Sequence, residues 1–192
     1  MNIFPIESLS TYKERNLYPL DTGWVFWIQN SIEQNDYKFN PIISFNSVYG
    51  FSLVYNSYKN NIVRLDRYVF MREGINPYYE DKSHINGGQL IITFLSKKKN
   101  NIIDNNTQIS QIHKLYNIIL CGLVGESLTT KLFNSRNLTG ITFVNNVYLK
   151  EVRIWFVGGV DMKLTYLDPE ILDLLVKNGM DIGKSVKIIK LS

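Results

Sequence analysis

The chain has 192 residues, a formal net charge of +4 at pH 7 and 45% hydrophobic residues, a composition typical of a single globular domain with a full hydrophobic core. Its single cysteine, Cys121, excludes an intrachain disulfide and fits a reducing compartment, so we expect a cytoplasmic protein. No signal-peptide pattern and no apolar run of membrane-spanning length is visible, which argues against a membrane partner.

The first part of the chain predicts an arm, two strands and a helix. Residues 1–17 are polar and are interpreted as a flexible N-terminal arm, which places the domain at 18–192. Two aromatic and β-branched runs, Trp24–Ile28 and Phe39–Phe45, predict strands. Asn46 or Ser47 can cap a helix that continues to about residue 58.

The rest of the chain predicts strands mixed with two further helices. Strands are expected over 68–71, 89–95, 138–148, 151–157 and 186–191. Apolar residues recur at helical spacing from about Thr107 to Leu123, and Asp168-Pro169-Glu170 has the capping residue and early proline of a helix start, with Gly179 as its stop. The order predicts an α+β domain with one mainly antiparallel sheet and three helices on one face.

The segment Phe70–Phe94 is the most informative for function. Residues 77–81, PYYED, place two tyrosines beside two carboxylates, and a Gly87-Gly88 turn and an apolar strand follow. An aromatic ring next to a fixed carboxylate can hold a flat, positively charged base, because the ring stacks on the base and the carboxylate accepts hydrogen bonds from its edge. The segment therefore predicts a nucleotide-binding pocket rather than a reaction centre.

Signatures of catalysis are largely missing from the sequence. His84 and His113 are the only histidines; we interpret them as a loop and a helix-surface residue, and Cys121 as a core residue, with no zinc-ligand spacing among them. Residues 179–185, GMDIGKS, have three residues between the glycines where a phosphate-binding loop has four, and they follow a helix instead of a strand. We expect no enzymatic activity, no metal and no cofactor.

In order and spacing, several segments resemble the eukaryotic translation initiation factor 4E family, which binds the 7-methylguanosine cap of messenger RNA. The matching pieces are Tyr18-Pro19-Leu20 with Trp24 and Trp27; Phe45–Val48 with Phe51 and Tyr55-Asn56; Phe70, Gly74-Ile75, Pro77, Tyr79–Asp81 and Gly87-Gly88; Leu123–Ser127; and Gly140 with Ile154-Trp155. The resemblance covers roughly residues 18–155 and implies a curved sheet with three helices on its convex face. It implies a role in translation initiation or its control.

The resemblance implies a cap-base site made of aromatic residues and one glutamate. Tyr79 stands where one stacking tryptophan belongs, Glu80 is the carboxylate that reads the base, and Trp155 contacts the methyl group. The second stacking residue comes from the loop after the first strand, where we favour Tyr37 over Phe39. Methylation at ring nitrogen 7 makes the base positively charged, so a tyrosine gains a cation–π attraction when it stacks.

The phosphate-binding half of the site departs from the family. The matched basic positions are Gln89, Asn146 and Glu151, which are neutral or acidic. Lys150 and Arg153 can replace some of the charge if their strand positions face the pocket; the alternative is that they are solvated strand residues. We expect phosphate contacts from Gln89, Asn146, Lys150 and Arg153, and a variant cap or cap-proximal nucleotides become alternative ligands.

The resemblance also implies a second, dorsal surface, which in the family binds a helical Tyr-x-x-x-x-Leu motif of initiation factor 4G or of the 4E-binding proteins. Its residues here are Tyr18, Pro19, Val48, Ser52, Asn117, Ile118 and Cys121. Ser52 replaces a tryptophan and Ile118 an acidic residue, so we expect the usual partner to bind poorly or a different one to be selected; the alternative is that Ile118 only packs against a neighbour.

A competing hypothesis keeps the fold and drops the ligand. The chain would then be a protein–protein module or translational decoy with weak or no cap binding, which contacts partners through the dorsal surface. An enzyme acting on capped RNA is disfavoured, because the carboxylate cluster or metal ligands needed for hydrolysis are missing from the sequence. The excess of Asn, Ile, Lys and Tyr, which have A/T-rich codons, suggests a virus or an intracellular parasite as the source.

Overall fold

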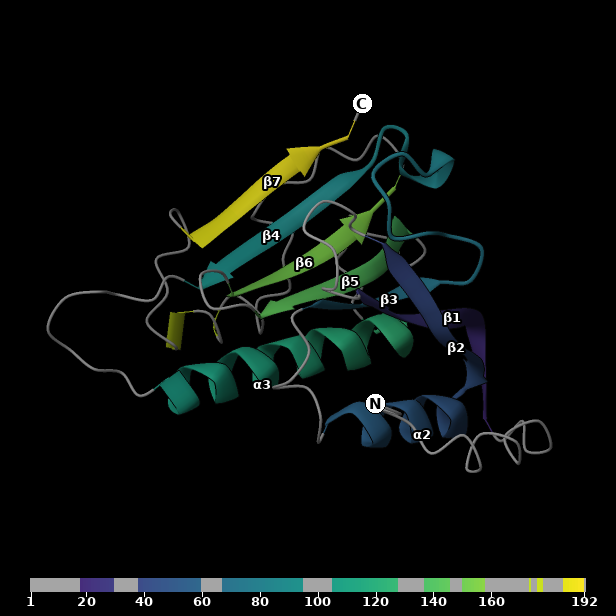
Figure 1. Cartoon of the computed structure of the whole chain (residues 1–192), viewed down its shortest axis with the longest axis horizontal. Helices are drawn as coiled ribbons and strands as arrows, with labels where there is room; N and C mark the ends of the chain where they lie inside the picture. The colour runs from purple at the N-terminus through teal and green to yellow at the C-terminus, as the bar shows by residue number, and fades with distance from the viewer. Residues whose placement is uncertain are drawn as a thin grey trace, which may run out of the picture.

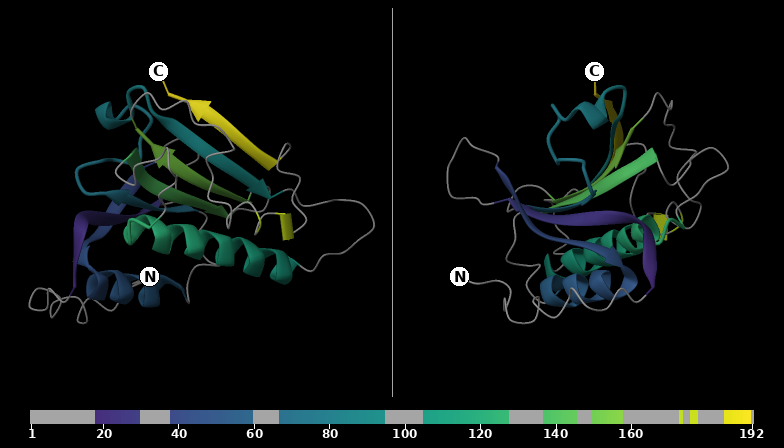
Figure 2. Two further views of the ribbon diagram at one scale, coloured as in Figure 1. Left: turned by 180° about the vertical axis from the view of Figure 1, so that it is seen from behind. Right: turned by 90° about the vertical axis from the view of Figure 1, so that its right-hand side faces the viewer.

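One curved antiparallel sheet dominates the computed structural model, which describes residues 18–29, 38–59, 67–94, 105–127, 137–145, 150–157, 173, 176–177 and 185–191. The described strands follow the order β2-β1-β3-β5-β6-β4-β7, and each pairing is antiparallel. Helices α2 and α3 cover the convex face, and the sheet bends away from them (Figures 1 and 2). The predicted α+β architecture is confirmed.

The elements agree closely with those predicted from the sequence. They are β1 (Pro19–Gln29), β2 (Phe39–Ser47), α2 (Val48–Lys59), β3 (Arg67–Arg72), η3 (Lys82–His84), β4 (Gly88–Phe94), α3 (Asn105–Val124), β5 (Leu138–Asn145), β6 (Lys150–Phe156) and β7 (Val186–Lys190). Most of the third predicted helix lies outside the described residues, although residues 173, 176 and 177 are helical. Among the described helices, none is long and apolar enough to cross a membrane.

The start of α2 shows how local sequence determines an element boundary. Of the two capping residues predicted, Ser47 is the one that acts, because its hydroxyl accepts a hydrogen bond from the Gly50 amide at 3.1 Å. A serine in this position satisfies one of the amide groups left free at a helix N-terminus. β2 therefore passes directly into α2.

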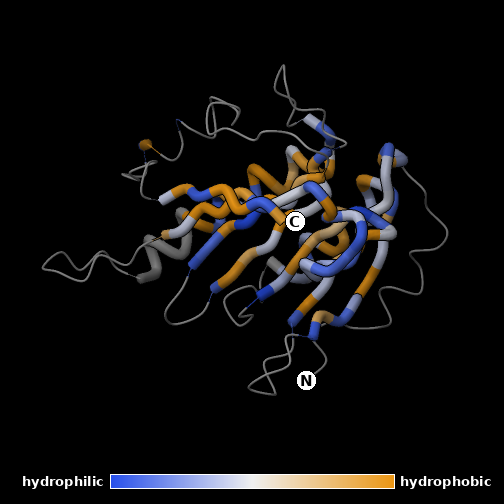
Figure 3. Tube along the Cα trace, turned by 90° about the horizontal axis from the view of Figure 1, so that it is seen from above, coloured by the Kyte–Doolittle hydropathy of each residue, from blue (hydrophilic) through white to orange (hydrophobic). Residues whose placement is uncertain are grey.

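Strand alternation divides the apolar residues between the two faces of the sheet. Along β3, Tyr68 and Phe70 belong to the main core between the sheet and the helices. Val69 and Met71 point the other way and form a smaller cluster with Phe39 and Trp155 on the concave face. Hydrophobic stretches accordingly recur along the strands in Figure 3. The concave face thus has an apolar floor on the side of the sheet opposite to α2 and α3.

A buried ion pair fastens the end of α3 to the sheet. Arg72 Nη1 lies 2.8 Å from Glu126 Oε1, and Arg72 Nε donates to the Leu138 carbonyl at 2.8 Å. The same guanidinium contacts the Thr22 hydroxyl and lies 5.1 Å from the centre of the Trp24 ring. The Arg72 side chain therefore joins β1, β3, β5 and the segment just after α3, and it fixes the relative position of these elements.

Candidate functional site

The loop between β3 and β4 carries the PYYED segment, and Asp81 organises it. The Asp81 carboxylate accepts hydrogen bonds from the Asn76 amide at 3.1 Å, from Asn76 Nδ2 at 2.8 Å and from the Ser83 amide at 2.9 Å. Burial acts to raise the pKa of Asp81, but these hydrogen bonds outweigh it and hold the pKa below its ordinary value. The ionised carboxylate thereby shapes the turn that presents Tyr79 and Glu80.

The Gly87-Gly88 pair lets this loop return to the sheet between two strands. A Cβ atom on Gly87 would lie 2.2 Å from the Phe156 carbonyl oxygen, and one on Gly88 would lie 2.3 Å from the Ile189 carbonyl oxygen. Both distances are far below van der Waals contact with backbone atoms that cannot easily move. Glycine is therefore required for the close approach of the loop to β6 and β7.

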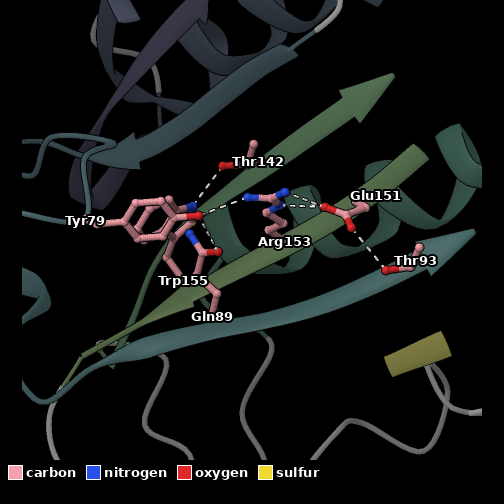
Figure 4. A network of polar contacts seen from close by, with 7 residues as sticks. All are labelled: Tyr79, Gln89, Thr93, Thr142, Glu151, Arg153 and Trp155. Atoms are coloured by element: carbon pink, nitrogen blue, oxygen red, sulfur yellow. Dashed lines mark hydrogen bonds and ion pairs between the residues drawn. The ribbon is translucent and has the colours of Figure 1, made fainter. Parts of the chain in front are cut away.

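Tyr79 and Trp155 form the aromatic centre of the site. The Trp155 side chain projects from β6 and is fixed by a 2.8 Å hydrogen bond from its Nε1 to the Thr142 hydroxyl. The Tyr79 ring leans over it, with 5.4 Å between ring centroids and 37° between ring planes (Figure 4). Tyr79 is 49% exposed whereas Trp155 is 3% exposed. The site thus presents one accessible ring above one covered ring.

His84 belongs to this aromatic group, and its interpretation as an ordinary loop residue is wrong. The side chain is fully buried, its ring centroid lies 4.6 Å from that of Trp155, and its Nε2 lies 3.1 Å from the Asn76 carbonyl oxygen. A carbonyl oxygen only accepts, so Nε2 carries the hydrogen. Burial lowers the pKa of His84. No pattern marked it, because it lies in a three-residue helix without apolar periodicity.

A polar chain runs from Tyr79 along the concave face (Figure 4). The Tyr79 hydroxyl donates to Gln89 Oε1 at 3.4 Å and accepts from Arg153 Nη1 at 3.0 Å. Arg153 Nε donates to Glu151 Oε2 at 2.8 Å, and its Nη2 lies 2.6 Å from the same oxygen. The Thr93 hydroxyl donates to the other Glu151 oxygen at 3.2 Å. Arg153 is therefore held between a tyrosine hydroxyl and a carboxylate.

Gln89 occupies an unusual position in this chain of contacts. It is fully buried on β4, directly opposite Trp155 of β6. Its carbonyl oxygen accepts from Tyr79, but its Nε2 has no hydrogen-bond partner among the described residues. A buried amide donor without a partner costs free energy, and it is available to an acceptor that enters the site.

The alternation of β6 decides which of its charged residues face the site. Glu151, Arg153 and Trp155 share the concave face, as their mutual contacts with Thr93 and Tyr79 show. Lys150 lies on the opposite face of β6, together with Val152 and Ile154, which belong to the core on the helix side. Asn146 lies outside the described residues.

The other residues that the sequence analysis predicted to bind the cap base differ in how the structure places them. Glu80 is exposed, and its carboxylate makes no hydrogen bond or ion pair with any described residue. Phe39 is 9% exposed, and its backbone exchanges hydrogen bonds with the Tyr78 hydroxyl at 2.9 and 3.3 Å. The Phe39 ring is therefore packed into the floor of the site, where it leaves little surface for a ligand. Tyr37 lies outside the described residues and stays a prediction.

The predicted dorsal residues lie on α2, on α3 and at the beginning of β1. Tyr18 is 76% exposed and its carbonyl accepts from the Val48 amide at 2.9 Å; Val48 and Ile118 are 45% and 42% exposed. The interpretation of Cys121 as a core residue is wrong, since it is exposed. We call the predicted set the dorsal patch: Tyr18, Pro19, Val48, Ser52, Asn117, Ile118 and Cys121.

His113 also differs from its interpretation as a helix-surface residue. It is partly buried on α3, its ring meets the Phe143 ring edge-on with 4.9 Å between centroids, and burial lowers its pKa. Within the described part of the chain, no group of three or more His, Cys, Asp and Glu side chains is arranged to hold a metal ion.

Comparison with known proteins gives consistent results. The family model of eukaryotic initiation factor 4E matches residues 19–165. Eukaryotic translation initiation factor 4E of Candida albicans is 32% identical over 167 residues, which cover 84% of this chain and 75% of that protein.

Similar solved structures include Ascaris suum eIF4E-3 with an m2,2,7G cap, which has a TM-score of 0.66 at 16% identity and covers 91% of this chain and 92% of that one. Caenorhabditis elegans eIF4E-3 with the 4E-binding protein Mextli has a TM-score of 0.67 at 17% identity and covers 90% of this chain and 93% of that one. At these identities the structural similarity shows a shared fold.

Proposed function

The chain belongs to the eukaryotic initiation factor 4E family, and on that premise we propose that it binds the 7-methylguanosine cap of messenger RNA in translation initiation or its control. It acts by binding, without catalysis. The observation that carries the proposal is the exposed Tyr79 ring beside the exposed Glu80 carboxylate, on a loop anchored by Asp81 above the buried Trp155. The Ascaris suum relative has been solved with m7G and m2,2,7G caps, which supports the same ligand class.

The base half of the site would work through stacking and edge recognition. Tyr79 stacks on the methylated base, whose positive charge adds a cation–π attraction to the ring. Glu80 accepts hydrogen bonds from the N–H groups of the guanine edge. Trp155 contacts the methyl group after the Tyr79 ring has moved aside, and Tyr37 closes the other face of the base.

The phosphate half of the site would rest on Arg153 and Gln89. Arg153 faces the concave side next to Tyr79, and Gln89 Nε2 is a buried donor without a described partner. Asn146, which lies between β5 and β6 in the sequence, is proposed as a third contact. The proposal does not use Lys150, because it shares its face of β6 with Val152 and Ile154, which belong to the helix-side core. Glu151 partly neutralises Arg153, so the phosphate grip is expected to be weak.

Retention on immobilised 7-methyl-GTP tests the assignment of the base site. Tyr79→Ala and Glu80→Ala should each reduce retention without changing the circular dichroism spectrum. Glu73→Ala removes an exposed carboxylate at the start of the same loop and should leave retention unchanged. Normal retention of both site variants would place the pocket elsewhere.

The exposed dorsal patch favours a second function, which is protein binding. We propose that a 4E-binding protein or an initiation factor 4G-like protein docks on Tyr18, Val48 and Ile118. Caenorhabditis elegans eIF4E-3 has been solved with Mextli and schistosome eIF4E with 4E-BP, which supports a partner of this kind. If millimolar 7-methyl-GTP does not raise the melting temperature, the decoy hypothesis replaces cap binding, because a bound ligand stabilises the folded state.

A further inference from the structure

The concave face contains a second cation, Lys187, which the site described above does not use. The cation that the site does use, Arg153, is paired with Glu151 by contacts of 2.6 and 2.8 Å. A guanidinium already paired with a carboxylate attracts phosphate less strongly than a free one. Additional positive charge on this face is therefore needed to hold more than one phosphate group.

Lys187 of β7 carries a positive charge and is aligned with Arg153 across the sheet. The register places Arg153 opposite Ile91 of β4, and Ile91 opposite Lys187 of β7. Residues that are directly opposite each other in adjacent strands project to the same face. Val186 and Ile188, the two neighbours of Lys187 in β7, pack against the helix-side core. Lys187 therefore projects from the concave face, where Arg153 lies.

The surroundings of Lys187 leave its charge available. It is exposed, and it forms no ion pair with a described residue. Its strand neighbour Ile91 is uncharged and 6% exposed, so the surface between Lys187 and Arg153 carries no carboxylate from β4. Glu151 lies farther along β6, opposite Thr93.

We propose that Lys187 binds the phosphate groups of the cap beyond the first one. The inference rests on the proposed cap function and assigns a further residue to that site. Arg153 is two residues, about 7 Å, from Trp155 along β6, and Lys187 is two strands, about 9.5 Å, from Arg153. A chain of phosphates that starts near Tyr79 therefore comes to Arg153 before Lys187. A lysine on an edge strand acts as a mobile point charge for phosphate.

The test compares ligands of increasing phosphate number in the full-length chain. Lys187→Gln should bind 7-methylguanosine and 7-methyl-GMP as the unchanged protein does. It should lose most of the additional affinity for 7-methyl-GTP, a loss of about three- to tenfold. Lys187→Arg should restore that gain, and the salt dependence of 7-methyl-GTP binding should be smaller for Lys187→Gln than for the unchanged protein.

Lys190→Gln is the matched control. Lys190 is exposed on the same strand and is paired with Gly88, but it lies on the face opposite to that of Lys187. Edge-strand lysines also discourage strand pairing between molecules, and this variant separates that role from ligand binding. The assignment of Lys187 would be overturned by equal losses for the two variants, or by equal affinity of the unchanged protein for 7-methyl-GMP and 7-methyl-GTP. Neither result would overturn the proposed cap binding. Failure of the unchanged protein to bind any methylated ligand would overturn the proposed function and this inference with it.

Discussion

The Tyr79 ring leans over the Trp155 indole, with 5.4 Å between ring centroids, and Trp155 is only 3% exposed. The Tyr79 hydroxyl is also held, by contacts to Gln89 at 3.4 Å and to Arg153 at 3.0 Å. A ligand that touches the indole must therefore displace the ring and loosen these two contacts. In the proposed function, base stacking by Tyr79 and phosphate contact by Arg153 are therefore linked through the Tyr79 side chain.

A series of substitutions at Tyr79 tests the stacking role. Tyr79→Ala should weaken binding of 7-methyl-GTP by about 1–3 kcal/mol, the range measured for loss of an aromatic stacking partner. Tyr79→Trp should strengthen it, because tryptophan is the best cation–π partner. Calorimetric titration measures both. Tyr18→Ala removes an exposed tyrosine of the dorsal patch and should leave affinity unchanged; an equal loss there would contradict a specific role for Tyr79.

Thr142→Val tests how Trp155 is held. The substitution removes the hydroxyl that accepts from Trp155 Nε1 at 2.8 Å and leaves a buried N–H group without its partner. Such a group costs about 1–3 kcal/mol. The free energy of unfolding from urea denaturation should fall by that amount. Thr142→Ser keeps the acceptor and should retain most of the stability, and an equal loss for both variants would show that the hydrogen bond is unimportant.

Arg72→Ala tests the buried ion pair at the end of α3. The Arg72 and Glu126 side chains are 8% and 14% exposed, so removal of one partner leaves a buried charge and should cost about 3–5 kcal/mol of folding free energy. Lys177→Ala is the control, because the Lys177–Asp173 pair is 71% and 57% exposed. The control should change stability by less than about 0.5 kcal/mol. Similar effects of the two substitutions would contradict the structural role of Arg72.

Stability should fall as the pH is lowered through the histidine range. Burial lowers the pKa of both His84 and His113 below the ordinary value of 6.5, so the unfolded chain binds protons at a pH where the folded chain does not. The free energy of unfolding is therefore unaffected above about pH 7 and declines below pH 6.5. The lowered pKa of Asp81 acts only below 3.8, outside this range.

Melting temperatures between pH 7.5 and 5.0 measure this decline. Replacement of both histidines by glutamine should flatten the profile, and His84 and His113 are the only histidines of the chain. An unchanged slope in the double variant would show that other groups cause the acid sensitivity. Because His84 packs at 4.6 Å against Trp155, His84→Gln should also weaken cap retention, whereas His113→Gln should not.

Periodicity and capping chemistry predicted most of the elements from the sequence. The strands and α3 follow from runs of apolar residues, and the start of α2 from the capping residue Ser47, because these signals act over short distances along the chain. The loop that carries Tyr79 and Glu80 was also predicted, since its aromatic and acidic residues are consecutive.

Contacts that depend on strand register or tertiary packing were not predicted. The pairing of Arg153 with Glu151 depends on the alternation of β6, and the alignment of Arg153 with Lys187 depends on the strand order β6-β4-β7. The burial of His84 depends on Trp155, which is distant in the sequence. Cys121 is exposed although its neighbours along α3 are mostly apolar. The sequence pattern of this helix does not distinguish its exposed face from its buried face at this position.

The ratio of affinities for 7-methyl-GTP and GTP tests the central claim most directly. The two ligands have the same phosphates and differ in the methyl group and the positive charge of the base. Stacking on Tyr79 with a cation–π contribution predicts at least about tenfold tighter binding of 7-methyl-GTP, or about 1.4 kcal/mol, by calorimetric titration of the full-length chain. Equal affinity for the two nucleotides would contradict the account.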